Sequence, residues 1–367
     1  MIYTITVNPT IDVTNVCEKP VKAGTTRPFE QWAHAGGKGV DVSRVVRNLG
    51  GTSVAMGFLG GFTGRRVEGR LLAEGLELDM VRISEETRTN VIIIAPEGEG
   101  SRKKVLDYRY NSPGPVVQDD KALELYERIK NLANVSAERK PTHVAVCGSL
   151  CEGMHATFYV TIIRYFKNMG AVVALDSSGS ALKESLRYAP RPHIIKPNIV
   201  EFDELINGAL TSNLSDKKYT ELLESKGKHE CLGSMCGEKC GMGTSDPSVF
   251  WKLLLKQARL CFDKFQGLTA ILLTLGARGI LLILQDKLLH GIYEGTVKVV
   301  CPVGAGDTAL AALLFSMEKG EHWETALRLA VAAATASVTK QGTESPSLED
   351  IEKYEDKVNI HQHQIES

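Results

Sequence analysis

AVVALDS, at residues 171–177, is one of four short β-rich runs that alternate with helical patterns. The other three are HVAVCGS at 143–149, HIIKPN at 193–198 and AILLTLG at 270–276. This alternation indicates parallel strands joined by crossover helices. The runs are nearly all apolar, as strands covered on both faces require. The sequence therefore predicts an α/β fold whose sheet is covered by helices on both sides.

Two amphipathic helices are predicted, and each is entered through glycines. From Lys38 to Leu49, valine and leucine recur at helical spacing, and two glycines end the segment. The second helix runs from about Asp307 to Glu318 and follows Gly304-Ala305-Gly306. Small residues at a helix N-terminus let a phosphate approach the backbone N–H groups, where the helix dipole also favours an anion.

Composition indicates a globular protein in which a small or anionic ligand would need a local site. The chain has 367 residues, 43% of them hydrophobic, and a formal net charge of −1, with no basic stripe that would select nucleic acid. The N-terminal strand lacks the features of a secretory signal, and no run reaches the roughly 18 apolar residues that cross a membrane. Eight cysteines are too sparse for a disulfide scaffold. We expect a cytoplasmic protein with reduced thiols and no membrane partner.

Three segments depart from the regular alternation. Residues 87–113 read as two extended arms around a polar turn, a hairpin that could project as a lid. Residues 211–247 are polar and Gly-rich and look like an insertion, and residues 358–367 look like a frayed tail. The insertion raises the question of a structural Zn²⁺ site, but its ligand spacing is not that of paired CxxC knuckles, so a flexible loop is favoured. Its potential metal ligands are His229, Cys231, Cys236 and Cys240.

Asp307 is the strongest catalytic candidate in the chain, within VGAGDTALAALLF at 303–315. A transferring phosphate repels a carboxylate beside an anion hole, so the residue makes sense there if it accepts the proton of an attacking hydroxyl. The alternative is a first-turn carboxylate that only the helix dipole stabilises.

Several motifs in a fixed order identify a family. AGGKGVDVSRV at 35–45, KPNIVEFDEL at 196–205 and GAGD at 304–307 together resemble the ribokinase-like (PfkB-type) carbohydrate kinases. TITVNPTID, TRTN and NSPGP look most like the branch that contains 1-phosphofructokinase, tagatose-6-phosphate kinase and the minor 6-phosphofructokinase. The resemblance covers almost the whole chain except roughly residues 211–247. It implies a three-layer α/β/α kinase domain over 1–357, with a mostly parallel central sheet and a small projecting β lid from about 10–34 and 87–112.

The resemblance implies ATP and Mg²⁺ as co-substrates and Asp307 as the base of an in-line transfer. The backbone amides of Gly304, Ala305 and Gly306 then form the anion hole. Asn198 and Glu201 would organise Mg²⁺ and its waters, as oxygen ligands suit this ion. The alternative for this pair is a first-turn acid capped by Asn198. The residues expected to bind ATP are Lys196, Asn198, Thr274, Gly276, Gly279, Gly304 and Gly306, although the turn at 274–279 taken alone is only a turn between two buried strands.

On the acceptor side, the resemblance assigns Asp12 to sugar hydroxyls and brings the backbone of Gly36 and Gly37 close to the sugar. Lys38 and Arg88 would hold a phosphate already on the substrate, since the planar guanidinium suits it. The alternatives are a Lys38–Asp41 pair at i+3 and a solvated strand charge at Arg88. Asn90 and Asn111 would lie along the lid arms and face the sugar.

Two substitutions near the expected sugar site leave the acceptor open. Asp41 stands where the family usually has an asparagine that contacts a sugar hydroxyl, and an ionised carboxylate only accepts hydrogen bonds. Cys151 and Glu152 replace a rigid pair of prolines. A sugar phosphate is the first hypothesis for the acceptor, and an unphosphorylated sugar, polyol or nucleoside is the second. A catalytically silent ligand-binding relative is a third, against which the intact GAGD and NxxE motifs argue. The apolar arm 91–94 suggests a homodimer formed through the lid.

Overall fold

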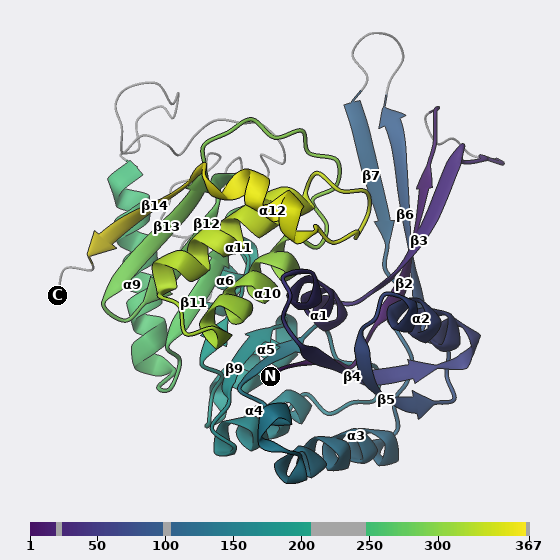
Figure 1. The fold of residues 1–367 in the computed structure, drawn as a ribbon, viewed down its shortest axis with the longest axis horizontal. Coiled ribbons are helices and arrows are strands. Elements are labelled where there is room, and N and C mark those ends of the chain that lie inside the picture. Colours follow the sequence, from purple (N-terminus) through teal and green to yellow (C-terminus); the bar gives the residue numbers. More distant parts are fainter. Residues whose placement is uncertain (20–23, 98–103, 207–246, 365–367) are drawn as a thin grey trace.

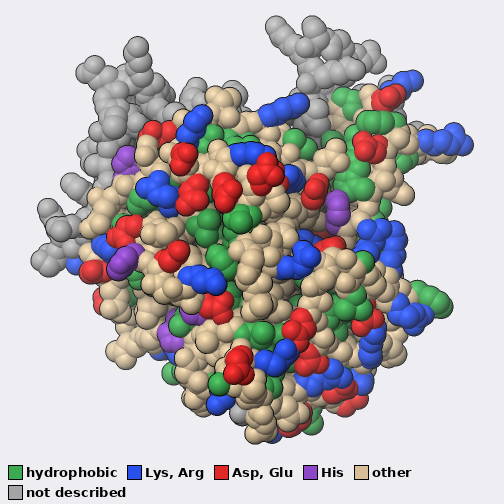
Figure 2. Space-filling model, viewed as in Figure 1, with side chains coloured by type: hydrophobic (Ala, Val, Ile, Leu, Met, Phe, Trp, Pro, Cys, Tyr) green, Lys and Arg blue, Asp and Glu red, His purple; other side chains and the backbone are tan. Residues whose placement is uncertain are grey.

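The computed structural model describes residues 1–19, 24–97, 104–206 and 247–364. Almost all of the predicted insertion, with its histidine and cysteines, lies outside these ranges. Within them, no helix has the length and apolarity needed to span a lipid bilayer. Acidic and basic side chains are interspersed over the face seen in Figure 2, as the near-zero net charge leads one to expect.

Ten strands of the described chain form one sheet in the order β14-β13-β12-β11-β10-β9-β8-β1-β4-β5 (Figure 1). All pairs from β11 to β5 are parallel, and the remaining pairs, on the β14 side, are antiparallel. The four predicted runs become β8, β9, β10 and β11, and their parallel pairing is confirmed. The parallel strands are β1 (Ile2–Thr6), β4 (Ser53–Gly60), β5 (Glu77–Ile83), β8 (His143–Cys147), β9 (Val172–Asp176), β10 (Ile194–Ile195) and β11 (Ala270–Thr274), and the antiparallel ones are β12 (Ile280–Leu284), β13 (Lys287–Tyr293) and β14 (Val358–Gln364).

The prediction of a frayed tail after residue 357 is wrong. Residues 358–364 form β14, which pairs with β13 along its whole length, from Val358 opposite Tyr293 to Gln364 opposite Lys287. Val358 is fully buried and Ile360 packs on the same core, so the strand is held by apolar contacts as well as by its ladder. This pairing has little signature in the sequence, because the strand alternates only two apolar residues with polar ones.

Helices cover both faces of the sheet, which confirms the three-layer prediction. Alternate residues of β1 point to opposite cores: Tyr3 and Ile5 lie with one set of helices, and Ile2 lies with the other. The first set comprises α3 (Asp119–Asn131), α4 (Phe158–Asn168), α5 (Gly179–Arg187), α6 (Ile199–Leu205) and α9 (Pro247–Lys264). The second comprises α1 (Lys38–Asn48), α10 (Ala305–Glu318), α11 (Trp323–Ser337) and α12 (Leu348–Glu355). Both predicted helices are present, and α10 begins two residues earlier than expected.

A separate four-stranded sheet stands beside the main body (Figure 1). Its strands run in the order β3 (Glu30–Gly36), β2 (Thr10–Val16), β6 (Arg88–Glu97) and β7 (Lys104–Tyr110). The antiparallel pairing of β6 with β7 confirms the predicted hairpin. Its base is fixed by a third apolar cluster, in which Ile11 and Ala35 pack with Leu71 of α2 (Gly61–Ala73). Because the lid strands start where β1 ends, this sheet borders the carboxyl edge of the main sheet.

Candidate active site

The predicted site residues lie at the carboxyl edge of the parallel strands, where ligands bind in open α/β sheets. Asp176 is the last residue of β9, and Lys196 directly follows β10. Asn198 bridges to Thr274 at the end of β11, so the KPN segment and the late turn lie side by side. Lys38 opens α1 after the turn at Gly37, whose φ is +127°.

Asp176 joins two lysines that come from distant parts of the chain. Its carboxylate lies 2.8 Å from Lys38 Nζ and 3.0 Å from Lys196 Nζ, and its side chain is fully buried. Burial opposes ionisation, but the two ammonium groups outweigh it and lower the pKa of Asp176 to about 2. Lys38 therefore pairs with Asp176 and not with Asp41, so the i+3 alternative for this lysine is wrong. The same charge raises the pKa of Lys38 although burial opposes it.

Asp307 lies in the first turn of α10, next to this cluster. Gly304, with φ +82°, precedes the helix in a left-handed conformation that favours glycine. A Cβ on Gly306 would lie 2.9 Å from Lys196 Nζ, so the glycine lets the ammonium group approach the helix N-terminus. Loss of solvent around the carboxylate and the negative charge of Asp176 raise the pKa of Asp307 well above its usual value, while Lys38 and Lys196 oppose the shift. A raised pKa is what a proton acceptor working near neutral pH needs.

A second cluster forms where the lid meets the body. Asp12 on β2 is buried and accepts a hydrogen bond from Asn90 Nδ2 on β6 at 2.8 Å. Burial raises the pKa of Asp12, whereas the hydrogen bonds that it accepts from Asn90 and Thr10 lower it. A Cβ on Gly36 would lie 2.7 Å from Asp12 Oδ2, so glycine is required for the carboxylate to lie against this backbone. Asn90 Oδ1 accepts from the Ser112 N–H, which ties the two lid arms together. The neighbouring Asn111 is exposed.

Arg88 is half-buried beside Asp12 and is not the solvated strand charge considered above. Its guanidinium donates to the backbone carbonyls of Asn8 and Ser112, each at 3.1 Å, and its Nε has no partner. It makes no ion pair with any carboxylate in the described part of the chain. Asp12 is the carboxylate whose charge acts on Arg88, whereas Asp176, Asp307 and Glu201 act on Lys38. The structure thus places the two predicted phosphate-binding cations in different clusters.

Asp41 is electrostatically linked to both clusters. It is buried on the first turn of α1 and pairs with Arg44 at 2.6 Å. Burial and the negative charge of Asp12 raise the pKa of Asp41 to about 7, against the opposing effect of Arg44. Its charge also raises the pKa of Asp307. A carboxylate here is therefore sensitive to whatever binds between Asp12 and Asp307.

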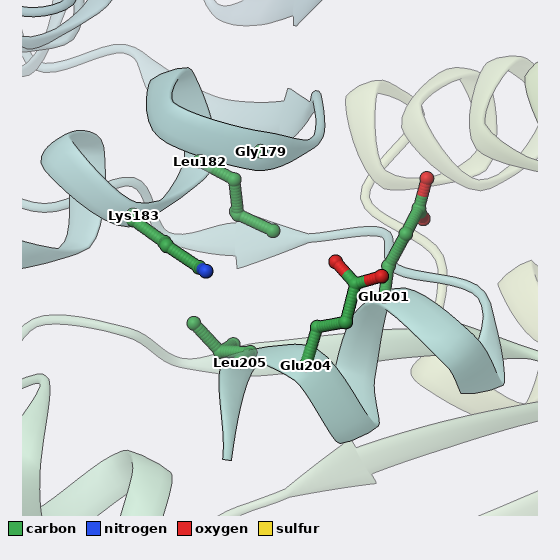
Figure 3. A pocket seen from close by; sticks show the side chains of 6 residues that line it. All are labelled: Gly179, Leu182, Lys183, Glu201, Glu204 and Leu205. Carbon is green, nitrogen blue, oxygen red and sulfur yellow. The ribbon is translucent and has the colours of Figure 1, made fainter. Parts of the chain in front are cut away.

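Asn198 and Glu201 form a capping box at the N-terminus of α6, as the structural alternative for this pair supposed. Asn198 N–H donates to Glu201 Oε2 at 2.8 Å, and Glu201 N–H donates to Asn198 Oδ1 at 2.9 Å. Figure 3 shows that the Glu201 carboxylate points away from Lys183 and Leu205 in the shallow pocket between α5 and α6. The predicted nucleotide turn is a 3₁₀ turn at Gly276–Arg278, with positive φ at Gly276 (+60°) and Gly279 (+87°).

Two buried polar residues of these clusters were not predicted from the sequence. Asp176 was read only as the end of an apolar strand, although a carboxylate at the carboxyl end of a parallel strand is itself a signal. Arg44 belongs to the predicted amphipathic helix but lies on the side away from its apolar stripe, where a solvated charge is the usual expectation. In both cases the partner that gives the residue its role lies elsewhere in the chain.

Comparison with known proteins agrees with this geometry. Residues 3–233 and 255–351 match the family described as pfkB family carbohydrate kinase. The chain is 27% identical over 340 residues to a 1-phosphofructokinase of Borreliella burgdorferi, covering 93% of this chain and 92% of the relative. It is 27% identical over 344 residues to a tagatose-6-phosphate kinase of Staphylococcus epidermidis, covering 94% of each.

Solved structures share the fold. Phosphofructokinase-2 from Escherichia coli in complex with substrates and products superposes with a TM-score of 0.77 at 23% identity, covering 97% of this chain and 98% of that one. Arabidopsis thaliana ribokinase complexed with ribose and ATP superposes with a TM-score of 0.63 at 20% identity, covering 96% and 98%. Because the family match spans most of the chain, the protein belongs to the pfkB family of carbohydrate kinases, enzymes for which ATP is the co-substrate.

Proposed function

We propose that this kinase transfers the γ-phosphoryl group of ATP to a hydroxyl of a sugar phosphate. The observation that carries the proposal is Arg88, a half-buried guanidinium beside Asp12 that makes no ion pair with a described carboxylate. A planar guanidinium with donors to spare suits a phosphate group. The names of the relatives, 1-phosphofructokinase and tagatose-6-phosphate kinase, support an acceptor that already carries phosphate.

The second cluster, here called the acceptor cluster, comprises Asp12, Asp41, Arg88 and Asn90. Its charges also suggest how the substrate lies. Asp12 and Asp41 are buried carboxylates that repel a phosphate and accept hydrogen bonds from hydroxyl groups. We place the sugar hydroxyls toward these two residues and the substrate phosphate toward Arg88. Asn90 and Asn111 remain candidates for further sugar contacts along the lid. Lys38 was predicted to share the phosphate with Arg88, but its pairing with Asp176 beside Asp307 supports a place at the transferring phosphoryl group.

In the proposed mechanism, Asp307 accepts the proton of the attacking hydroxyl. The backbone amides of Gly304, Ala305 and Gly306 and the ammonium groups of Lys38 and Lys196 stabilise the negative charge that develops on the phosphoryl oxygens. Asp176 pairs with both lysines and holds them at this end of the site.

Nucleotide and metal binding are assigned to the body of the fold. ATP would contact Lys196, Asn198 and the turn that contains Thr274, Gly276 and Gly279, where positive φ angles bring backbone close to a ligand. Mg²⁺, bound with the nucleotide, would neutralise phosphate charge. Asn198 and Glu201 offer the oxygen donors that suit Mg²⁺ and its waters, since one Glu201 oxygen remains beyond the capping box.

The test is a coupled ATP-consumption assay with Mg²⁺ against phosphorylated and unphosphorylated sugars, polyols and nucleosides. Turnover confined to sugar phosphates is the expected result. Activity only on unphosphorylated acceptors would overturn the proposal and favour the second candidate, in which Asp12 and Asp41 read hydroxyls and Arg88 has no phosphate to bind. No turnover with any acceptor would instead indicate a silent relative of the family.

We also propose a homodimer through the lid. The lid and the segment leading into it expose large aromatic side chains, with Phe29 59%, Tyr108 41% and Tyr110 61% exposed. Tyr108 and Tyr110 are two residues apart on β7 and so share one face of the lid sheet, and exposed apolar side chains gathered on one face often mark protein contacts. Light scattering at micromolar concentration should give twice the chain mass of 40.0 kDa, and a monomer would contradict the proposal.

A further inference from the structure

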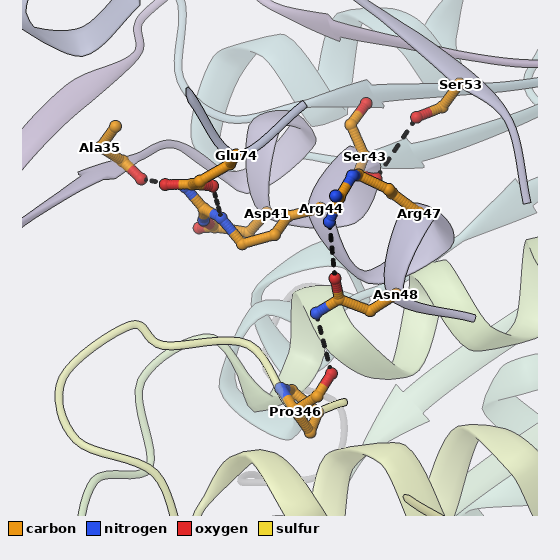
Figure 4. A network of polar contacts seen from close by, with 9 residues as sticks. All are labelled: Ala35, Asp41, Ser43, Arg44, Arg47, Asn48, Ser53, Glu74 and Pro346. Carbon is orange, nitrogen blue, oxygen red and sulfur yellow. Dashed lines mark hydrogen bonds and ion pairs between the residues drawn. The ribbon is translucent and has the colours of Figure 1, made fainter. Parts of the chain in front are cut away.

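Arg44 is a buried arginine whose guanidinium is fully engaged by the protein itself. It is 8% exposed and lies on α1, one turn after Asp41. Its Nη1 donates to Asp41 Oδ1 at 2.6 Å, its Nη2 to the Ala35 carbonyl at 2.6 Å, and its Nε to Glu74 Oε2 at 2.5 Å (Figure 4). All three nitrogens are therefore occupied, and Arg44 has little capacity to contact a substrate directly.

The groups that Arg44 connects surround the acceptor cluster. Ala35 immediately precedes Gly36, whose backbone lies against Asp12, and Asp41 is one of the two buried carboxylates of that cluster. Glu74 follows α2, which packs under the base of the lid, and its side chain is 37% exposed. A single guanidinium thus fixes the entrance of α1, the Asp41 carboxylate and the end of α2 relative to one another.

Charge explains why such a residue is needed here. Asp12 and Asp41 are both buried, and two neighbouring carboxylates without a counter-charge would force one of them to take up a proton. A protonated Asp41 could donate as well as accept, and its orientation toward a sugar hydroxyl would no longer be unique. Arg44 supplies the counter-charge from inside the protein, while Glu74 is exposed enough to be solvated.

We propose that Arg44 is a positioning residue for the acceptor: it holds Asp41 in place and favours its ionised form, so that this carboxylate receives a hydrogen bond from an acceptor hydroxyl. The inference rests on the proposed function only in requiring that an acceptor with hydroxyl groups binds between Asp12 and Asp41. It makes the identity of residue 41 and that of residue 44 interdependent, because Arg44 is needed only as long as residue 41 carries a charge.

The experiment is a double-mutant cycle with Arg44→Met and Asp41→Asn in the full-length enzyme. The readouts are KM for the best acceptor of the panel, KM for ATP, kcat and the midpoint of thermal unfolding. Arg47→Met is the matched control, because Arg47 lies on the same helix but is exposed, and its side chain donates within the described part of the chain only to Asn48, at 3.5 Å (Figure 4). Arg44→Lys tests whether a cation of a different shape restores part of the function.

Arg44→Met should raise the acceptor KM at least about tenfold, with KM for ATP nearly unchanged, because the Asp41 side chain loses the partner that orients it and takes up a proton more readily. In the Asp41→Asn background the same change should cost less than about threefold, since no charge then needs compensation. Arg44→Lys should fall between these values, and Arg47→Met should match the wild type.

An equal cost of Arg44→Met in both backgrounds would overturn the inference, as would equal rises of KM for ATP and for the acceptor, which a purely structural role predicts. If Arg44→Met does not fold, the cycle is run with Arg44→Lys, and an equal cost in both backgrounds again overturns it. Failure of the proposed function looks different: the wild type would then prefer an unphosphorylated acceptor or turn over none. If the acceptor is unphosphorylated, the same cycle still tests Arg44. If the wild-type enzyme neither binds nor phosphorylates any acceptor with hydroxyl groups, this inference is overturned as well.

Discussion

Replacing Asp176 by asparagine removes the only negative charge within ion-pair distance of Lys38 and Lys196 in the described chain. The pKa of Asp176 is lowered from 3.8 to about 2 in the fold. A difference of roughly two pKa units corresponds to about 3 kcal/mol of stability at neutral pH, present above the unfolded pKa and lost as pH falls toward about 2. The cost of breaking a buried pair, about 3 to 5 kcal/mol, agrees with this value.

For a chain of this length the entropy of unfolding is about 0.8 kcal/mol per kelvin, so the Asp176→Asn midpoint should fall by about 4 °C in scanning calorimetry. Asp79→Asn is the control, because Asp79 pairs with Arg128 at 2.7 Å but both side chains are more than a third exposed. It should lose at most about 1 kcal/mol, or about 1 °C. The destabilisation of Asp176→Asn should also shrink between pH 4 and pH 2, where the native carboxylate takes up its proton. Equal midpoints for the two variants would refute the view that Asp176 is the buried counter-charge of the lysines.

Two further substitutions separate the clusters. Lys38→Met removes a cation that lowers the pKa of Asp307. We therefore expect kcat to fall and the acidic limb of the kcat/KM profile to move to higher pH. An acidic limb at the same pH as in the wild type would show that Lys38 does not act on the catalytic base. Arg88→Met should raise KM for a phosphorylated acceptor at least about tenfold while KM for ATP stays the same. A rise in KM for ATP alone would place Arg88 in the nucleotide site instead.

Much of the fold could be predicted because its signals are local. Apolar runs and glycine-flanked helical patterns identified β1, β8, β9, β10, β11, α1, α10 and the lid hairpin, whose patterns lie within their own residues. The strand β14 was missed because its stability comes from pairing with β13, some 70 residues earlier, and from packing of Val358 and Ile360. Such a contact leaves no pattern in the seven residues themselves.

The site divides in the same way. Asp307, Asp12 and Arg88 stand in recognisable motifs, and the structure gives each of them a buried or half-buried place at the edge of the sheet. The ion-pair partners of the charged residues were not predictable, because the tertiary fold brings them together from distant parts of the chain. Lys38, for example, pairs with Asp176, 138 positions away, and not with its helical neighbour Asp41. Asp41 in turn forms an ion pair with Arg44, three residues later on the same helix. That spacing permits an ion pair but does not require one.

The central claim is that Asp307 is the base of a phosphoryl transfer, and Asp307→Asn tests it most directly. The amide keeps the shape of the side chain but cannot accept the proton, so kcat should fall by about 10³-fold or more while the Kd for ATP, measured by equilibrium dialysis, stays within about threefold of the wild type. Turnover near that of the wild type, with ATP binding intact, would remove Asp307 from the mechanism and contradict the account.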